Sequence, residues 1–353
     1  GEEAQHSMAQ AVHYIEDVRK ESDNVILLDA GDMLQGTPAV YYYDHVDSVR
    51  NVIPMIYNSL KYDAVCIGNH DIETGHAVYD KFVRQMNMPV LGANAVNKET
   101  GKPYFQPYTI LEREGKKIAV IGLTTPYVPH WLPEYYWSGI EFEDMVESAH
   151  YWMNYVRDNE KPDAVIGLFH SGYDYTHSFQ TAEDKCNENA SVLVAQQVEG
   201  FDVILIGHDH KVYNQVVKSP SGREVPVCDA GTAARYVGDV TIEFVAGEAR
   251  PRVTSKLVAL TNQKESSKYN KEFLPQMLAV KAYSKKVVGR LKDELISSES
   301  LFGSAKFTNL VHATMLKHSG AEISVAAPLL IDANLPVGEV TVGNMFSIYK
   351  FEN

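Results

Sequence analysis

Cysteine is scarce in this chain of 353 residues, and long apolar runs are missing from it. The three cysteines, Cys66, Cys186 and Cys228, are widely spaced, form no CxxC pattern and cannot all pair with one another. Cys66 lies in the apolar run 64–67, where a buried and unreactive thiol is expected. No stretch of about 18 apolar residues is present, so the sequence predicts no membrane-spanning helix.

Positive charge is also in short supply, because 32 lysines and arginines face 46 aspartates and glutamates, which gives a formal net charge of −14. This balance argues against non-specific binding of nucleic-acid polymers, which requires clustered lysine and arginine. A small anionic substrate is still compatible with it, because bound metal ions can reverse the local field. Hydrophobic residues make up 45% of the chain, so a sizeable core is expected.

The first 250 residues alternate short apolar runs with amphipathic stretches, an order that predicts an α/β fold with helices on the faces of layered sheets. The runs expected to be buried strands are 25–28, 64–67, 118–121, 164–169 and 203–206. Helical spacing is found at 9–20, 78–86, 143–158 and 190–198. In such folds, chemistry collects at the carboxyl ends of the strands.

The later residues indicate a second piece of structure. Partly exposed strands at 241–244 and 253–260 are expected to close a first domain, which we assign to residues 1–262. A charged helical pattern from 266 to 298 predicts a connecting helix in a linker over 263–299. Residues 300–353, with an amphipathic helix and a strand at 323–326, are too few for an independent core, so they are expected to begin a second α/β domain.

Four short segments place metal-ligand side chains directly after apolar runs. They are Gly31-Asp32, Gly68-Asn69-His70-Asp71, His170-Ser171-Gly172 and Gly207-His208-Asp209-His210. Their oxygen and imidazole groups are of the kind that binds Mn, Fe or Zn rather than Ca. Because His208 and His210 lie two apart in an extended segment, their side chains are expected to point to the same side, which suits two adjacent metals. The combination favours a two-metal hydrolase that acts on phosphate esters.

Each segment taken alone also has a structural explanation. An isolated Gly-Asp is typical of a turn or a helix cap, and an Asn-His-Asp of an ordinary strand-to-helix turn. A lone histidine such as His170 is more often a hydrogen-bonded structural group, but four such segments in series favour the metal site. The other histidines assigned to the surface or the core are His76, His130, His150 and His177, whereas Trp131 and Trp137 lie in a proline-rich loop that could rim the cleft.

These segments, in this order and at this spacing, resemble the calcineurin-like metallophosphoesterase superfamily, and within it the bacterial 5′-nucleotidase and 2′,3′-cyclic-nucleotide 2′-phosphodiesterase/3′-nucleotidase family. The resemblance covers about residues 8–353 and includes 122–126, Glu188-Asn189-Ala190 and 349–353. It implies a four-layer α/β/β/α sandwich that holds two divalent metal ions (Mn, Zn or Fe), followed by a connecting helix and the start of a C-terminal nucleotide-binding domain. It also implies a periplasmic or extracellular, cell-surface location.

The resemblance further implies a role for each metal ligand. Asp32 would bridge the two metals. Asn69, His170 and His208 would complete one site, and His210 would serve the other. A hydroxide held between the two cations would then attack phosphorus.

The resemblance places His70 next to the scissile phosphate, where it would stabilise the transition state or protonate the leaving oxygen. Its carboxylate partner is either Glu73, which aligns with the acid of the family's dyad, or Asp71, the neighbour used in other branches. Both alternatives stay open at this point.

Two departures from the family pattern affect these expectations. No Asp-x-His segment precedes Asp32, and His6 and His13 have different neighbours, so the second metal site has only Asp32 and His210. The chain begins Gly-Glu-Glu-Ala, which we interpret as a cut or processed end, and we expect the missing strand to belong to a longer chain. The loop that carries a phosphate-binding arginine in 5′-nucleotidases has the sequence Ala-Ala-Pro-Leu at 326–329, which favours the cyclic-phosphodiesterase branch.

We therefore expect metal-dependent hydrolysis of a small-molecule nucleotide phosphoester, with 2′,3′-cyclic nucleotides and 3′-nucleotides as the favoured substrates. A 5′-nucleotidase, a sugar-nucleotide hydrolase and a sulfur-ester hydrolase of related fold are the enzymatic alternatives. A non-catalytic protein with a broken metal site, which binds nucleotides or a partner, is the alternative of another class. No nucleic-acid polymer is expected as a partner, and the sequence does not predict the oligomeric state.

Overall fold

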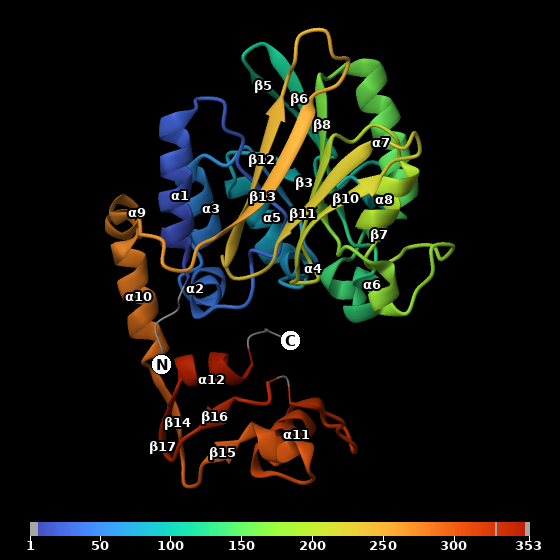
Figure 1. Ribbon diagram of the computed structural model, residues 1–353. Coiled ribbons are helices and arrows are strands. Elements are labelled where there is room, and N and C mark those ends of the chain that lie inside the picture. Colours follow the sequence, from blue (N-terminus) through green and yellow to red (C-terminus); the bar gives the residue numbers. More distant parts are fainter. Residues whose placement is uncertain (1–5, 329, 350–353) are drawn as a thin grey trace. The chain divides into compact units, whose positions relative to one another are not determined.

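The computed structural model describes residues 6–328 and 330–349 (Figure 1). The chain divides into two compact units. Unit 1 comprises residues 1–34 and 53–272, and unit 2 comprises residues 35–52 and 273–353. Residues 35–52, to which the sequence patterns assign no separate role, thus belong to the same unit as the C-terminal residues.

Two β-sheets form the centre of unit 1. The smaller sheet is parallel, with the order β1-β2-β3, and the larger has the order β10-β11-β9-β8-β6-β5 with antiparallel strands only at its two edges. The strands of these sheets are β1 (Leu28–Asp29), β2 (Ala64–Cys66), β3 (Val90–Leu91), β5 (Tyr108–Arg113), β6 (Lys116–Thr124), β8 (Ala164–His170), β9 (Val203–Ile206), β10 (Val212–Lys218) and β11 (Glu224–Ala230). The other strands of unit 1 form two antiparallel pairs, β4 (Ala95–Asn97) with β7 (Ile140–Phe142) and β12 (Tyr236–Glu243) with β13 (Arg252–Ala259).

The two sheets pack face to face, as the predicted four-layer sandwich requires. Ala64, Cys66 and Leu91 of the smaller sheet share one buried cluster with Ile166 and Leu168 of the larger sheet. The opposite face of the larger sheet packs against helices α7 (Met145–Asn159) and α8 (Ser191–Gln197). Figure 1 shows α1 (Met8–Glu21) and α3 (Val52–Leu60) on the other side of the sheets, so the layers run helix, sheet, sheet, helix.

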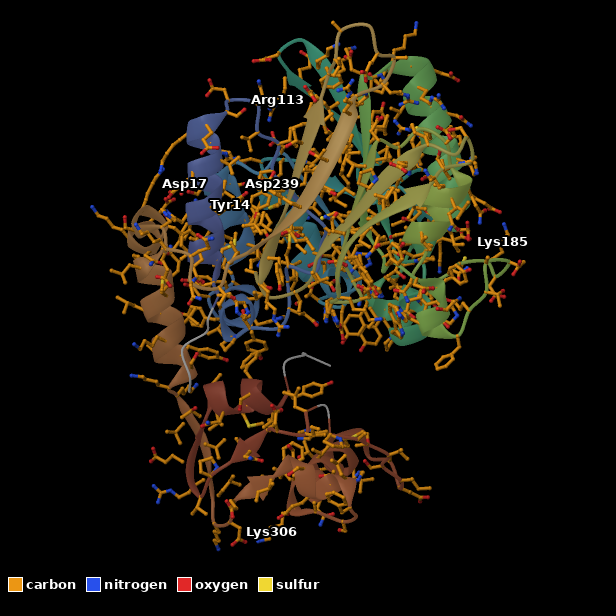
Figure 2. All side chains as sticks on the ribbon, in the orientation of Figure 1. Tyr14, Asp17, Arg113, Lys185, Asp239 and Lys306 are labelled. Carbon is orange, nitrogen blue, oxygen red and sulfur yellow. The ribbon has the colours of Figure 1, made fainter. Side chains whose placement is uncertain are left out.

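Local sequence signals account for the ends of the long helices. The Ser7 side chain caps α1 by accepting the N–H of Gln10, and Asp144 caps α7 by accepting two backbone N–H groups. The Tyr14 hydroxyl then donates to Asp239 Oδ2 at 2.6 Å, which attaches α1 to β12 (Figure 2). The shorter helices of unit 1 are α4 (Asn69–Ile72), α5 (His76–Gln85), α6 (Val128–Trp131) and α9 (Ser267–Glu272), with 3₁₀ turns at Glu134–Tyr136 and Tyr175–Ser178.

The predicted strand at 25–28 is wrong for most of its length, because β1 contains only Leu28 of that run. Side chains replace the strand partner here. The Arg113 guanidinium donates to the Val25 carbonyl, and the Leu27 N–H donates to Asp63 Oδ2. The Leu27 carbonyl also accepts the Asp63 N–H, so both backbone polar groups of Leu27 and the carbonyl of Val25 have partners without a neighbouring strand.

Unit 2 has a small core of its own, formed by Leu295, Phe307, Leu335, Val340 and other apolar residues. Its residues come from two antiparallel strand pairs and from the helices α11 (Lys306–Ser319) and α12 (Val342–Ile348). The strand pairs are β14 (Val287–Leu291) with β17 (Gly338–Thr341) and β15 (Leu295–Ile296) with β16 (Asn334–Leu335). The unit also contains α2 (Pro38–Tyr41), α10 (Leu274–Ser284), a π-helix at Tyr42–Val46 and a 3₁₀ turn at Ser297–Leu301.

Two expectations for this region are corrected. The connecting helix ends at Ser284 rather than near 298, because β-branched Val287 and Val288 favour the strand β14 that follows. Residues 323–326 form no strand, and Ile323 and Val325 are 79% and 85% exposed instead of packing on a sheet. Leu329 and residues 350–353, which carry part of the resemblance, lie outside the described residues. Of the helices that the structure describes, none has the length and apolar character to cross a membrane.

Candidate metal centre

Four of the predicted ligands meet at the carboxyl ends of strands from both sheets. Asp32 and Asn69 follow β1 and β2 of the smaller sheet, His170 is the last residue of β8, and His208 follows β9 of the larger sheet. Parallel strands end at the same edge of a sheet, which explains why segments so far apart in sequence converge. Backbone strain also collects here, since Asp32 and His208 have positive φ angles of 62° and 94°.

The converging atoms of these four side chains are all hydrogen-bond acceptors or imidazole nitrogens. His170 Nε2 lies 3.1 Å from both Asp32 Oδ2 and Asn69 Oδ1, and His208 Nδ1 lies 2.9 Å from Asn69 Oδ1. The ligand atoms of Asp32, His170 and His208 lie within 4.8 Å of one another. The donor set is therefore compact enough for a single ion.

The second nitrogen of each imidazole determines which atom faces this cluster. His170 Nδ1 lies 2.7 Å from the Ala30 carbonyl oxygen, and His208 Nε2 lies 3.1 Å from Glu188 Oε1. Both of these partners only accept hydrogen bonds, so those nitrogens carry the protons. In the neutral imidazoles, the lone pairs of His170 Nε2 and His208 Nδ1 then face the oxygens of Asp32 and Asn69. A divalent cation satisfies four such groups together, so the residues present fit a metal ion.

The pKa values of Asp32 and His170 also show that this cluster attracts positive charge. Burial favours the neutral form of each group, but their mutual charge and hydrogen bond outweigh it. As a result, the pKa of His170 is raised to about 9, and that of Asp32 is held below its ordinary range. A cation of higher charge in place of the proton would be attracted more strongly.

His210 does not join this cluster. Within the described part of the chain, the candidate ligand group comprises Asp32, His170 and His208, and the His210 side chain is exposed on a backbone with a φ of 57°. Burial lowers the pKa of His210, and the charge of Asp32 acts in the opposite direction. Asp32 and His210, the two ligands expected for the second metal, therefore do not form one cluster among the described residues.

Asp71 is occupied by the backbone of the loop that carries Asp32. Its carboxylate accepts the N–H groups of Asp32 (3.0 Å), Met33 (2.7 Å), Leu34 (2.8 Å) and Gly68 (2.8 Å), and the residue is fully buried. Burial and the nearby charge of Asp32 raise the pKa of Asp71 to about 6. Asp71 therefore holds the two ligand loops together.

His70 has a different carboxylate neighbour. Its Nδ1 lies 2.5 Å from Glu73 Oε2, one helical turn further on, and its backbone N–H donates to Asp32 Oδ1 at 2.8 Å. Burial lowers the pKa of His70, but the hydrogen bond to Glu73 and the charge of Asp32 outweigh burial and raise it. Of the two carboxylates left open by the sequence, Glu73 is the one in contact with the His70 ring.

Glu188 is a site residue to which the sequence patterns assigned no role. Besides contacting His208, its carboxylate accepts the Ser178 hydroxyl, and its backbone carbonyl accepts the hydroxyls of Ser171 and Thr125. Burial raises the pKa of Glu188, but the bonds from His208 and Ser178 outweigh burial and lower it. Only its place in the Glu-Asn-Ala motif marks it in the sequence, because its contact with His208 spans 20 residues.

Comparison with known proteins assigns the chain to a family. The calcineurin-like phosphoesterase profile matches residues 5–212. The chain is 31% identical over 248 residues to a 5′-nucleotidase of Vibrio cholerae, which covers 66% of this chain and 43% of that protein. It is 30% identical over 218 residues to a 2′,3′-cyclic-nucleotide 2′-phosphodiesterase/3′-nucleotidase of Yersinia enterocolitica, covering 58% of this chain and 32% of that one.

A solved structure supports the fold. The 5′-nucleotidase precursor from Thermus thermophilus superposes with a TM-score of 0.71 at 22% identity, covering 97% of this chain and 68% of that protein. The chain spans less than half the length of the two curated relatives above. Members of the matching family use divalent metals to hydrolyse phosphoesters, which agrees with the four converging ligands. The chain belongs to the calcineurin-like phosphoesterase family.

Proposed function

We propose that this protein hydrolyses nucleotide phosphoesters, with 2′,3′-cyclic nucleotides and 3′-nucleotides as its preferred substrates. The observation that carries the proposal is the convergence of Asp32, Asn69, His170 and His208, whose potential ligand atoms lie 2.9–3.1 Å apart. The names of the curated relatives support a nucleotide substrate, and the Ala-Pro sequence at 327–328 supports the cyclic-phosphodiesterase branch.

Asp32, Asn69, His170 and His208 would hold one divalent metal, and Asp32 and His210 would contribute to a second. When bound, such ions neutralise phosphoryl oxygens and lower the pKa of water towards neutrality. The Ala30 carbonyl and Glu188 keep the two imidazole rings in the orientation that this binding requires. Asp71 keeps the Asp32 loop against Gly68, so the ligands are positioned before a metal arrives.

In the same proposal, His70 acts on the leaving group. Glu73 holds Nδ1, so Nε2 is the atom that would donate a proton to the leaving oxygen. Asp71 is not assigned a part in this transfer, because both of its oxygens accept backbone N–H groups. Unit 2 would begin a nucleotide-binding domain, and a location outside the cytoplasm belongs to the same proposal.

The test is a comparison of 2′,3′-cyclic AMP, 3′-AMP and 5′-AMP as substrates after reconstitution with Mn²⁺. We expect the first two to be hydrolysed with the higher kcat/KM and chelation to stop turnover. His170→Ala is expected to remove the bound Mn²⁺ and lower kcat/KM by about 10³-fold or more, because one ligand of a compact set is lost. His150→Ala, an exposed histidine on α7, is the matched control.

Three results would contradict parts of this proposal. A higher kcat/KM for 5′-AMP would favour the 5′-nucleotidase alternative. Full turnover by His170→Ala would exclude the assigned metal centre. Tight binding of nucleotides without any metal-dependent turnover would support the non-catalytic alternative.

A further inference from the structure

A tryptophan ring lies beside the metal ligand His208 within unit 1. The ring centroids of Trp131 and His208 are 5.5 Å apart, and the two ring planes differ by 31°. The His170 ring is also close to His208, with centroids 5.2 Å apart, but its plane is turned by 72°, so the two imidazoles meet edge to face. Of these two neighbours, Trp131 is therefore the one whose ring is closer to parallel with His208.

The polar contacts of His208 leave one motion of its ring open. Nδ1 lies 2.9 Å from Asn69 Oδ1, and Nε2 lies 3.1 Å from Glu188 Oε1. These partners hold the two nitrogens, but the ring can still rotate about the line that joins them. Because the lone pair of Nδ1 lies in the ring plane and away from that line, such a rotation changes its direction. A flat ring packed against the imidazole restricts this rotation.

The backbone that carries Trp131 is attached to the ligand segments. Trp131 is the last residue of α6, which follows the carboxyl end of β6. At the start of this connection, the Thr125 N–H donates to the His170 carbonyl at 2.7 Å, and the Thr125 hydroxyl donates to the Glu188 carbonyl at 3.0 Å. Within α6, the side chain of Val128 is fully buried. The position of Trp131 is therefore fixed relative to His170 and Glu188, two residues of the metal centre.

Neighbouring aromatic rings also hold the Trp131 side chain. The Tyr127 ring meets that of Trp131 at 5.3 Å and 62°, and Tyr127 is itself stacked on His130 with centroids 3.9 Å apart. Trp131 nevertheless remains 40% exposed, whereas its neighbours Val128 and Leu132 are buried. Core packing therefore accounts for Val128 and Leu132, while the Trp131 ring lies at the surface beside the ligand.

From these contacts we propose that Trp131 is a positioning residue for His208, whose imidazole it keeps in the orientation that directs Nδ1 at a bound metal. The inference rests on the metal centre of the proposed function and adds to it a residue outside the ligand set. Trp131 acts through His208 and is assigned no part in bond breaking. Its effect falls on metal affinity, because a ligand ring that is held in its binding orientation beforehand loses less freedom when the metal binds.

The first test measures Mn²⁺ affinity by titration calorimetry of the full chain. Trp131→Ala is expected to lower the affinity about three- to tenfold, which is the effect of losing one aromatic pair. Trp131→Phe keeps a flat ring and should retain most of the wild-type affinity. Trp131→Leu keeps apolar bulk without a flat ring, so its affinity should fall towards that of Trp131→Ala.

A second readout is the visible absorption of bound Co²⁺, which depends on the number and arrangement of its ligands. We expect Trp131→Ala to change this absorption and Trp131→Phe to leave it close to that of the wild type. The matched control is Tyr155→Ala, which removes a ring of nearly equal exposure (41%) on α7 that contacts Trp152. This control should change neither the Mn²⁺ affinity nor the Co²⁺ spectrum, and thermal unfolding of every variant is measured alongside.

The outcomes separate this inference from the proposed function. An unchanged Mn²⁺ affinity and Co²⁺ spectrum in folded Trp131→Ala would overturn the positioning role, while Mn²⁺-dependent hydrolysis by the wild type would still support the proposed function. Equal losses in Trp131→Phe and Trp131→Leu, or the same loss in Tyr155→Ala, would also overturn it. The comparison of the Phe and Leu variants decides the matter if Trp131→Ala does not fold. A wild type that binds no Mn²⁺ would overturn both proposals.

Discussion

Asp71 and Glu73 lie two residues apart, yet the structure predicts opposite consequences of removing them. Asp71→Ala deletes the acceptor for four backbone N–H groups in a site with no exposed surface. Each N–H left unpaired costs about 1–3 kcal/mol, so the loss is about 4 kcal/mol even at the low end. The cost of burying the ionised carboxylate, visible in its raised pKa of about 6, offsets part of this. We therefore expect a net destabilisation of about 3 kcal/mol.

This loss can be measured by calorimetry of the metal-free protein. For a unit of this size, about 3 kcal/mol corresponds to a fall in Tm of about 6–12 °C. Glu73→Gln leaves the four hydrogen bonds accepted by Asp71 in place, so its Tm should fall less than that of Asp71→Ala. Its kcat with Mn²⁺ should fall about tenfold or more, because the His70 ring loses the carboxylate that orients it.

The pair of variants tests the division of roles directly. An unchanged Tm in Asp71→Ala would show that its four hydrogen bonds do not hold the loop. A normal kcat in Glu73→Gln, together with a selective loss of kcat in a folded Asp71→Asn, would refute the assignment of Glu73 and return the role of partner to Asp71.

Individual contacts lead to three further predictions. Glu188→Gln should weaken Mn²⁺ binding by about 10–100-fold while leaving the fold intact, because it removes the carboxylate that orients His208. Titration calorimetry measures the Mn²⁺ affinity, and an unchanged affinity would contradict the orienting role of Glu188. Gly68→Ala should lower Mn²⁺ affinity by about tenfold or more in the same titration, because the added Cβ would lie 2.2 Å from Asp32 Oδ1 and displace that ligand. Asp202→Ala should destabilise unit 1 by about 3–5 kcal/mol in urea unfolding, because it leaves two arginines without their buried carboxylate; a loss under about 1 kcal/mol would show that this ion pair contributes little.

The parallel core of unit 1 was predictable because its strands are buried on both faces. The runs at 64–67, 118–121, 164–169 and 203–206 all match strands of the structure. A short segment with apolar side chains on both faces is typical of a central strand that is covered on both sides. The run at 25–28 has the same composition but pairs only at its end, and Arg113 and Asp63 bond the Val25 carbonyl and the Leu27 N–H in place of a strand. No local pattern indicates such long-range side-chain contacts.

Helix length was predictable only where a cap or a stripe of apolar residues marks it. Ser7 and Asp144 mark the beginnings of α1 and α7, and both helices were predicted within two residues at each end. The helix that ends at Ser284 was predicted to run on to 298, because charged residues such as Lys285 and Lys292 fit a helix surface and a strand edge equally well. The pairing of β14 with β17, about 50 residues away, decided the outcome.

The sequence alone predicted the metal-ligand side chains, because they follow apolar runs in the order typical of the calcineurin-like family. Which of these side chains act together became clear only in three dimensions. The fold brings Asp32, Asn69, His170 and His208 into one cluster, leaves His210 exposed, and places Glu73 rather than Asp71 on the His70 ring. Ligand type is a property of a single residue. A shared ion, a tautomer or a hydrogen-bond partner depends instead on distances of about 3 Å between loops 20 to 140 residues apart, which folding alone establishes.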